Sequence, residues 1–390
     1  MKNVCNARGN WYALRVARIT WELLRTLAGV HTPVGPAVSL YLELDPRKTL
    51  NWSDVVTRST SLLASVRAAR NGFAHEDRVS LDADLQRIDR FMHGELDREG
   101  VRGLALFASS AGGLWEVLPL STSVRDSAHV DRELYLVPLV AAVPFGEPAL
   151  VAVVNRKRGS LYRIENGSVE ELADLSDPDV PRRHDQGGWS QANYERHVDE
   201  LAHRHMETVA HAIDRRFRRD GRPPVVLVCP EDERSEVQSM LAADVQAAVI
   251  GWTSVEAHAG APAVAQAVQP LLAQRRAGRE VEALRRWRDD RGMGREVARG
   301  WDDVLAAASD GRVEELLYDA GADAATGYRC SICRRGVAQE GQCPVDGGAV
   351  EAVDALNHAL LRTLAYGGTA VAVSDRDALD GEAICARLRW

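Results

Sequence analysis

The sequence has 390 residues, of which 45% are hydrophobic and 27% charged, and its formal net charge is −8. These values are typical of a globular chain of two or three domains and exclude a disordered or low-complexity polypeptide. No apolar run is long enough to cross a membrane, and no signal-peptide core follows the basic N-terminus. The acidic net charge argues against a general nucleic-acid binder, so we expect a cytoplasmic protein with a more specific task.

The basic charge is almost entirely arginine, because the chain has only three lysines. Arginine forks suit phosphate groups and stack on bases better than lysine does. The six cysteines include only one cluster, at Cys330, Cys333 and Cys343. This pattern does not indicate a disulfide framework and fits a reducing compartment.

Residues 1–34 read as an N-terminal extension with a short helix near 21–27. We expect an N-terminal α/β domain at 35–145. Its alternating apolar pattern predicts a strand at 38–44, and apolar residues at three- and four-residue spacing predict two helices. The predicted helices are 52–70 and 80–97, and two further strands are predicted at 101–108 and 114–118.

Prolines near residue 145 mark the start of a middle domain, 146–262. A buried strand at 149–154 is followed by two strands that Asn166-Gly167 joins as a hairpin. The remaining predicted elements are the strands 161–164, 169–172, 225–228 and 245–250 and the helices 190–219 and 231–243. A strand meander followed by alternating helix and strand is compatible with a ribonuclease-H-like sheet.

The third predicted domain, 263–390, begins with a long polar helix at 262–290 that links it to the middle domain. Its other predicted elements are the helices 296–308 and 350–364, the strands 313–318, 369–373 and 383–390, and a Cys-rich insert at 328–348. The sequence therefore predicts an α/β fold class with three α/β domains, the third carrying a small zinc-knuckle-like insert.

A polar loop with two adjacent glycines, Gly187 and Gly188, precedes the longest helix pattern of the chain. Glycines allow backbone turns that other residues cannot adopt, and Ser190 is a suitable N-cap for the helix. Such a loop can enter a narrow site. The alternative is a strand-to-helix turn without chemistry.

Three α/β domains with this loop resemble the archaeal and eukaryotic class 1 peptide release factors and Pelota, and more closely the bacterial archaeo-eukaryotic release factor family. The family loop reads Gly-Gly-Gln-Ser, then Phe, Arg and a later His. Gly187, Gly188, Ser190, Arg196 and His203 match it, and Tyr194 stands for the Phe. The Cys-rich insert and the terminal Ile-x-Ala-x-Leu-Arg-Trp also resemble family features.

The resemblance implies hydrolysis of the ester that joins a nascent peptide to tRNA on the ribosome. The family's catalytic Gln follows the glycines directly, but here Trp189 stands at that position and Gln191 two positions later. Gln191 is either a shifted functional equivalent or an ordinary first-turn residue. The stop-codon-reading motif Asn-Ile-Lys-Ser is absent from the sequence, which argues against codon-specific termination.

On this resemblance, Gln191 would place a water and Gly187 and Gly188 would allow close approach to the ester. The candidate RNA-binding residues are Trp189, Arg182, Arg183 and Arg196. The arginines would meet phosphate or brace the loop. Trp189 would stack on an unpaired base, or instead fold back onto its own domain.

Five of the eleven histidines lie between 184 and 211. Their spacing does not place them on one helix face, so histidines that are solvated or contact phosphate are favoured over a metal site.

Cys330, Cys333, Cys343 and Asp346 have zinc-knuckle spacing, with Asp346 where a fourth Cys would stand. Carboxylates do ligate zinc, so we expect a structural zinc ion. The alternative is a metal-free loop.

The function expected is peptidyl-tRNA hydrolysis independent of a stop codon, in ribosome rescue or quality control. The implied partners are the ribosome, with its rRNA and P-site tRNA, and a translational GTPase; no membrane is implied, and the protein is expected to be a monomer. The first alternative is a non-catalytic A-site occupant, similar to the hibernation factor Balon. The second is a free-standing RNA- or protein-binding module that never meets the ribosome.

Overall fold

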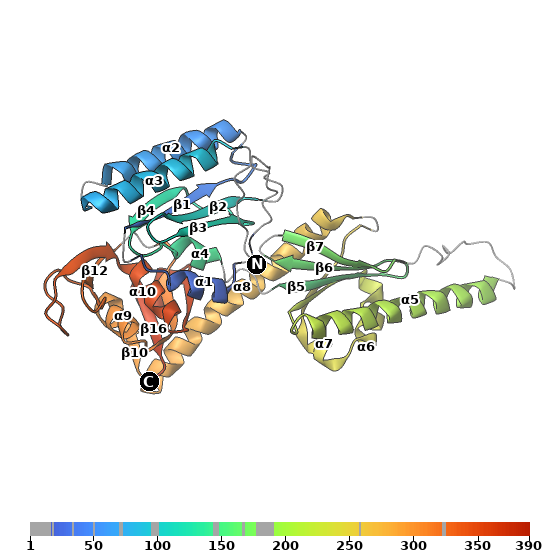
Figure 1. Ribbon diagram of the computed structural model, residues 1–390. Helices are drawn as coiled ribbons and strands as arrows, with labels where there is room; N and C mark the ends of the chain where they lie inside the picture. Colours follow the sequence, from blue (N-terminus) through green and yellow to red (C-terminus); the bar gives the residue numbers. More distant parts are fainter. Residues whose placement is uncertain are drawn as a thin grey trace. The chain divides into compact units, whose positions relative to one another are not determined.

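We describe a computed structural model of the chain. The described residues are 17, 19–32, 35–49, 51–69, 73–94, 101–142, 148–165, 168–176, 191–256, 259–321 and 325–390. The chain divides into two compact units (Figure 1). Unit 1 combines residues 1–144 with 280–390, and unit 2 is residues 145–279. The predicted division into three domains, with boundaries near 145 and 262, is not tested by this division into two units and stays a prediction.

The first half of unit 1 is a four-stranded antiparallel sheet in the order β3-β2-β1-β4. Helices α2 and α3 cover one face, against Val38, Leu40 and Leu42, while Tyr41 and Phe107 face a second core (Figure 1). The elements are α1 (Trp21–Ala28), β1 (Ala37–Glu43), α2 (Trp52–Ala69), α3 (His75–Met92), β2 (Gly103–Ser109), β3 (Leu114–Leu120), β4 (Ser127–Asp131) and α4 (Val137–Ala142).

The second half of unit 1 has a four-stranded sheet in the order β10-β16-β11-β15 and a three-stranded sheet in the order β13-β12-β14. Helices α9 and α10 share one apolar core with α1, α4 and the second face of the first sheet. The elements are β10 (Val297–Arg299), α9 (Gly300–Ser309), β11 (Val313–Asp319), β12 (Thr326–Cys330), β13 (Gly336–Val337), β14 (Val350–Asp354), α10 (Ala355–Ala365), β15 (Thr369–Val373) and β16 (Ile384–Leu388).

Unit 2 is built on a five-stranded sheet in the order β7-β6-β5-β8-β9. Strands β5, β6 and β7 form an antiparallel meander, and β5, β8 and β9 are parallel. This is the strand order of a ribonuclease-H-like sheet, and that prediction is confirmed. The elements are β5 (Ala149–Val154), β6 (Gly159–Glu165), β7 (Ser168–Asp174), α5 (Gln191–Arg219), β8 (Val225–Val228), α6 (Arg234–Met240), α7 (Ala243–Ala248), β9 (Val249–Thr253) and α8 (Ala261–Gly292), whose residues from Glu280 on belong to unit 1.

The α/β class and most predicted elements are confirmed, but several boundaries are wrong. Residues 245–248 form the end of α7 rather than the start of a strand. A short apolar run fits either state, and here Val245 is the helix residue that packs into the core of unit 2. Residues 350–354 form β14, paired with β12, before α10 begins. Helix α3 starts at His75 and ends at Met92, five residues earlier at each end than predicted.

Strand β4 and helix α4 are elements that the sequence pattern did not reveal. The predicted hairpin pairing of β6 with β7 is confirmed, although its turn at 166–167 lies outside the described residues. Within the described residues no helix combines the length and apolarity that a bilayer span needs.

Candidate functional site

Helix α5 follows the glycine loop in the sequence, and its apolar face anchors it to the sheet of unit 2. Met206, Val209, Ile213 and Phe217 repeat at three- and four-residue spacing and pack against the strand residues of one core. The first described side chains, Arg196 and His197, are exposed, and packing begins at Val198. The start of α5 projects beyond the sheet of its own unit (Figure 1).

Two polar contacts brace the first half of α5. Arg156, which lies two residues after β5, forms an ion pair with Asp199. His203, which matches the family histidine, is bonded through Nδ1 to Glu236 Oε1 of α6 at 2.8 Å. Both contacts are at least partly exposed, so each contributes at most about 1 kcal/mol to stability. They orient the helix more than they stabilise the fold.

Most of the predicted loop residues lie outside the described part of the chain. These are Arg182, Arg183, Gly187, Gly188 and Trp189. Gln191 is the first residue of α5, but its side chain is not among the described ones. The catalytic and RNA-binding assignments therefore stay predictions, and only Arg196 of these residues has a described side chain, which is exposed.

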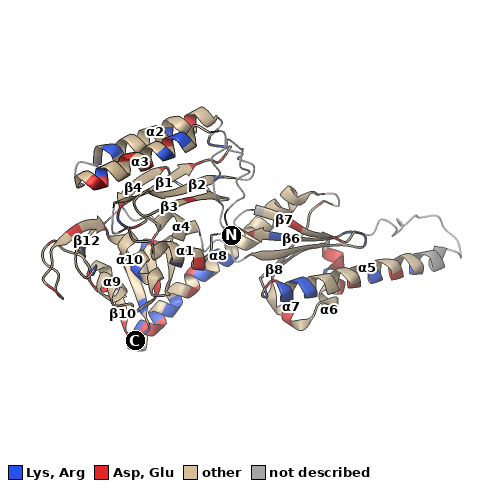
Figure 2. Ribbon diagram, in the orientation of Figure 1, with Lys and Arg blue, Asp and Glu red and all other residues tan. Residues whose placement is uncertain are grey.

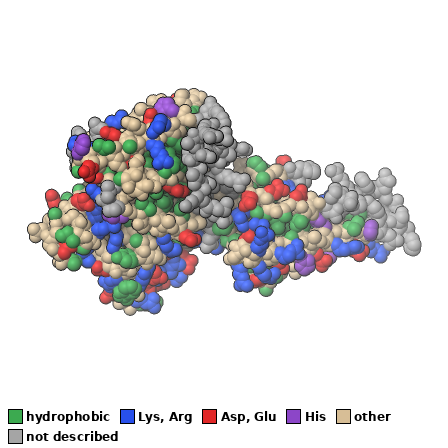
Figure 3. Space-filling model, viewed as in Figure 1, with side chains coloured by type: hydrophobic (Ala, Val, Ile, Leu, Met, Phe, Trp, Pro, Cys, Tyr) green, Lys and Arg blue, Asp and Glu red, His purple; other side chains and the backbone are tan. Residues whose placement is uncertain are grey.

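The histidines of α5 do not converge in the part of the chain that the structure describes. His203 and His211 are exposed, whereas His205 is 6% exposed and its Nε2 has no hydrogen-bond partner. Acidic and basic residues alternate along the ribbon of α5 (Figure 2), and histidine side chains lie among charged ones on the face seen in Figure 3. Among the described residues, the one group of three or more potential metal ligands lies elsewhere.

That group is formed by Cys330, Cys333, Cys343 and Asp346, the four residues predicted from spacing. Each ligand pair lies on a tight turn. The first turn begins at Cys330, the last residue of β12, and the second begins at Cys343, directly after the bridge between Gln342 and Ala349. In the first turn, Arg334 N donates to the Cys330 carbonyl at 3.1 Å, and Arg334 has a φ of +63°. In the second, Gly347 N donates to the Cys343 carbonyl at 2.9 Å with a φ of +71°. Two turns that end in the left-handed region direct both ligand pairs inward.

The donor atoms of the four residues all lie within 4.8 Å of one another. Cys333 Sγ and Cys343 Sγ are 3.5 Å apart, and Cys330 Sγ is 3.3 Å from Asp346 Oδ1. In a tetrahedral zinc site with Zn–S bonds of about 2.3 Å, neighbouring sulfurs are about 3.8 Å apart. The arrangement thus fits a zinc ion with a small expansion, and three sulfurs with one carboxylate are a donor set that zinc accepts.

The electrostatics at Cys330 also favour a metal ligand. Desolvation raises the pKa of this thiol, but backbone N–H groups of Cys333 and Ile332 lower it, and the net shift is downward. The N–H of Ile332 lies 3.3 Å from Cys330 Sγ. Because the thiolate is the form that binds metal, these donors prepare Cys330 as a ligand. Three cysteines and a carboxylate fill the four positions of a tetrahedral site, which is the donor arrangement of a structural zinc ion.

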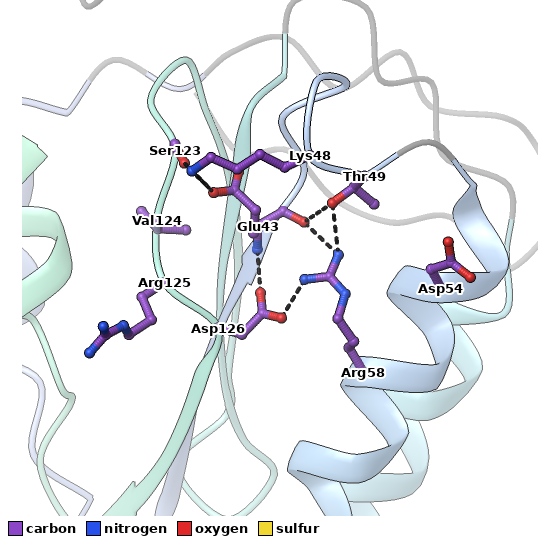
Figure 4. A pocket seen from close by; sticks show the side chains of 9 residues that line it. All are labelled: Glu43, Lys48, Thr49, Asp54, Arg58, Ser123, Val124, Arg125 and Asp126. Carbon is purple, nitrogen blue, oxygen red and sulfur yellow. Dashed lines mark hydrogen bonds and ion pairs between the residues drawn. The ribbon is translucent and has the colours of Figure 1, made fainter.

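A polar pocket of about 700 Å³, which no sequence motif indicates, lies in the first half of unit 1 (Figure 4). Its lining comes from the end of β1, the start of α2 and the segment before β4. Arg58 donates to the Glu43 carbonyl at 2.9 Å and pairs with Asp126, while Lys48 binds Glu43 Oε2 at 2.9 Å. The full lining is Glu43, Lys48, Thr49, Asp54, Arg58, Ser123, Val124, Arg125 and Asp126.

The charges of this pocket balance, with three acids and three bases. Two of the bases are already engaged by acids of the same pocket, and Arg125 points away from them in Figure 4. The pocket therefore lacks the excess positive charge that an anionic ligand would need.

Comparison with known proteins supports the resemblance over part of the chain. Residues 135–276 match the model of bacterial archaeo-eukaryotic release factor family 10. This segment contains the glycine loop and all of α5. The relation to archaeo-eukaryotic release factors that the sequence indicated is confirmed there.

A second similarity is to the DNA mismatch repair protein MutS of Thermus thermophilus, with 30% identity over 139 residues. The matched segment is 35% of this chain and 16% of MutS, so the chain spans a small part of the length of that relative.

Solved structures that match the chain include the archaeal translation termination factor aRF1, at 15% identity and a TM-score of 0.27 over 95% of this chain and 99% of that one. Pelota of Archaeoglobus fulgidus is 14% identical, with a TM-score of 0.34 over 74% of this chain and 79% of that one. Another match is to a chain in a model of ribosome-bound archaeal Pelota and ABCE1. It is 12% identical, with a TM-score of 0.39 over 96% of this chain and 95% of that one.

Proposed function

We propose that this protein is a ribosome-binding, release-factor-like protein that hydrolyses the peptidyl-tRNA ester without reading a stop codon. The observation that carries the proposal is the position of the glycine loop. In the sequence it directly precedes α5, the long helix of the ribonuclease-H-like unit, and residues 135–276, which include both, match a release-factor family.

The geometry of α5 supports a loop that reaches away from its own domain. The helix has 29 residues, which corresponds to about 43 Å of length. Its later turns pack on the sheet, while its first described side chains are exposed. A loop at the free end of a braced helix can enter a narrow site such as the peptidyl transferase centre.

In the proposed reaction, the chain orients a water and stabilises charge rather than supplying a strong base. The Gln191 amide is not basic, but its carbonyl and N–H groups can hold a water against the ester carbon. A backbone N–H of the loop would stabilise the developing oxyanion. Gly187 and Gly188 would permit the close approach, and Arg182, Arg183 and Arg196 would meet phosphate or brace the loop.

Trp189 favours a second candidate function, because it occupies the position of the family's catalytic Gln. In that case the protein would occupy the ribosomal A site without cleaving the ester, as a hibernation factor. Its indole would stack on an rRNA or tRNA base.

The third predicted domain would, in either case, dock near the stalk base of the ribosome or on a translational GTPase.

The test is single-turnover peptide release from ribosomes that carry P-site peptidyl-tRNA and no stop codon. Wild type is compared with Gln191→Ala, Trp189→Ala and Trp189→Gln, and co-sedimentation with ribosomes is measured in parallel. Release by wild type that Gln191→Ala abolishes is the expected result. Binding without release, with activity appearing only in Trp189→Gln, would replace hydrolysis by the occupant function. Neither binding nor release would reject both.

A further inference from the structure

Two arginines that flank the first cysteine pair reach out of the insert into the first half of unit 1. Arg329 precedes Cys330, and its side chain is only 5% exposed. Its guanidinium lies 2.9 Å from Asp131, 2.9 Å from Glu133 and 2.6 Å from Glu351. Arg334, which follows Cys333, forms an ion pair with the same Glu133. Asp131 ends β4, so these contacts join the insert to the first sheet.

The acceptor side of this contact is buried as well. The Glu133 side chain is 5% exposed and is shared by Arg329 and Arg334, with His358 Nδ1 at 3.5 Å. Asn357 holds the backbone directly after Glu133, because its side chain donates to the Leu134 carbonyl at 3.0 Å and accepts from Leu136 N at 2.8 Å. Residues 131–136 are therefore held by side chains from the second half of unit 1.

The two halves of unit 1 also share an apolar core that contains Leu134, Leu136, Leu360 and Leu364. Apolar burial is strong but has no direction, so it holds the halves together without fixing how they are seated. Charge-assisted hydrogen bonds from arginine forks are directional. The seating of residues 131–136 thus depends on where Arg329 and Arg334 are held.

The positions of these two arginines depend in turn on the turn between the cysteines. Arg334 has a left-handed backbone, which is unfavourable for a side chain with a Cβ. The turn is closed by the bond from Cys330 N to the Arg335 carbonyl at 2.9 Å and by the cysteine side chains themselves. The adjoining strand β13 has only two residues, and the buried side chains at the turns are the ligands Cys330 and Cys343. A metal ion is what this insert can use in place of an apolar core.

We propose that a metal ion bound by Cys330, Cys333, Cys343 and Asp346 also fixes the position of the first half of unit 1 against the insert, through Arg329 and Arg334. Metal loading fixes the turn, the turn presents the two arginines, and the arginines hold Asp131 and Glu133. The consequence is that loss of metal loosens residues 131–136, which carry none of the ligands.

The insert provides a matched control in Arg335. This arginine follows Arg334 directly but pairs with Asp310, which caps α9 in the same half of unit 1. Substituting Arg335 removes a charge and an ion pair of the insert without removing a contact to the first sheet. Arg334 and Arg335 are both partly exposed, at 33% and 21%, so neither substitution removes a fully buried group.

The experiment is hydrogen–deuterium exchange of the full chain, read on short peptides that cover 132–140. It compares zinc-loaded wild type, wild type stripped by a chelator, and zinc-loaded Arg334→Gln and Arg335→Gln. The Leu136 amide is the reporter, because its hydrogen bond goes to Asn357 Oδ1. Removal of zinc and Arg334→Gln should each raise exchange there at least about fivefold, and Arg335→Gln should not.

The stripped wild type needs no substitution, so the test does not depend on a variant that folds. Faster exchange confined to residues 326–354 after chelation, with 132–140 unchanged, would overturn the proposal. So would a wild-type protein that takes up no zinc, or equal effects of Arg334→Gln and Arg335→Gln.

Discussion

Arg163 on β6 donates a hydrogen bond of 2.7 Å to Oδ2 of Asp220, the residue directly after α5. Arg216 Nε donates to the same oxygen at 2.7 Å, and the Asp220 side chain is 9% exposed. Burial alone would raise the pKa of this carboxyl, but the hydrogen bonds from Arg216 and Arg163 outweigh it and lower the pKa. The pair closes the C-terminal end of the loop-bearing helix onto its sheet.

Replacing Asp220 by Ala should destabilise unit 2 by about 2 kcal/mol, because it removes the acceptor that Arg163 and Arg216 share and leaves Arg163 only its longer contact with Glu170. Urea unfolding followed by circular dichroism measures the loss in the transition that includes unit 2. The control is Glu200→Ala, which removes an exposed ion pair with Arg204 and should change stability by less than about 0.5 kcal/mol. Equal losses in the two variants would contradict this account.

The same substitution, Gly to Ala, should have opposite effects at Gly159 and Gly278. A Cβ on Gly159 would lie 2.3 Å from Cγ2 of Val209, a buried branched side chain of α5. The helix would have to move off the sheet, at a cost of about 1–3 kcal/mol. A Cβ on Gly278, an exposed position inside α8, meets nothing within 4 Å. There Ala should stabilise the helix by about 0.5–1 kcal/mol.

Thermal unfolding of the two alanine variants beside wild type checks this pair. A stable Gly159→Ala protein would mean that α5 is not held as closely against β6 as the contact with Val209 requires.

His129 should make unit 1 lose stability on acidification. Burial lowers the pKa of His129 to about 4, and its ring stacks on Tyr135 at 3.6 Å between centroids. In the unfolded chain a histidine titrates near 6.5, so between about 4 and 6.5 only the unfolded state takes up the proton. The contribution of His129 to stability is therefore complete above about pH 6.5 and is lost as the pH falls from 6.5 to 4, by about 1–2 kcal/mol after allowance for partial exposure.

His129→Phe keeps an aromatic ring against Tyr135 and removes the titration. The Tm of wild type minus the Tm of this variant should fall as the pH is lowered from 7 to 4.5, because only the wild type loses the contribution of His129. Because other groups titrate in both proteins, parallel Tm curves would show that His129 contributes no pH dependence.

Asp346 should be the weakest of the four metal ligands, because a thiolate is the softer donor and suits zinc better beside three cysteines. Asp346→Ala should lower zinc affinity by more than about tenfold, and Asp346→Cys should raise it. Competition with a chromophoric chelator measures both. An unchanged affinity in Asp346→Ala would remove Asp346 from the site.

The features that the sequence predicted well depend on residues close together in the chain. The four candidate ligands lie between 330 and 346, and their two tight turns bring them together without help from the rest of the fold. The meander of unit 2 and the long helix α5 were likewise readable, because hairpin pairing and helical periodicity are local. Helix α7 was misread, since a six-residue element is too short for periodicity to decide.

What only the tertiary structure decided are contacts between distant segments. Arg329 is 198 residues from Asp131, and Arg334 is 201 residues from Glu133, yet they form one network around the buried Arg329 and Glu133 side chains. The pocket near Arg58 likewise forms only because β1 pairs with β4, and no local sequence pattern predicts that pairing. Local sequence sets backbone preferences and turn geometry. Which charged side chains meet depends on how whole elements pack, because many arrangements of distant charges are compatible with the same local pattern.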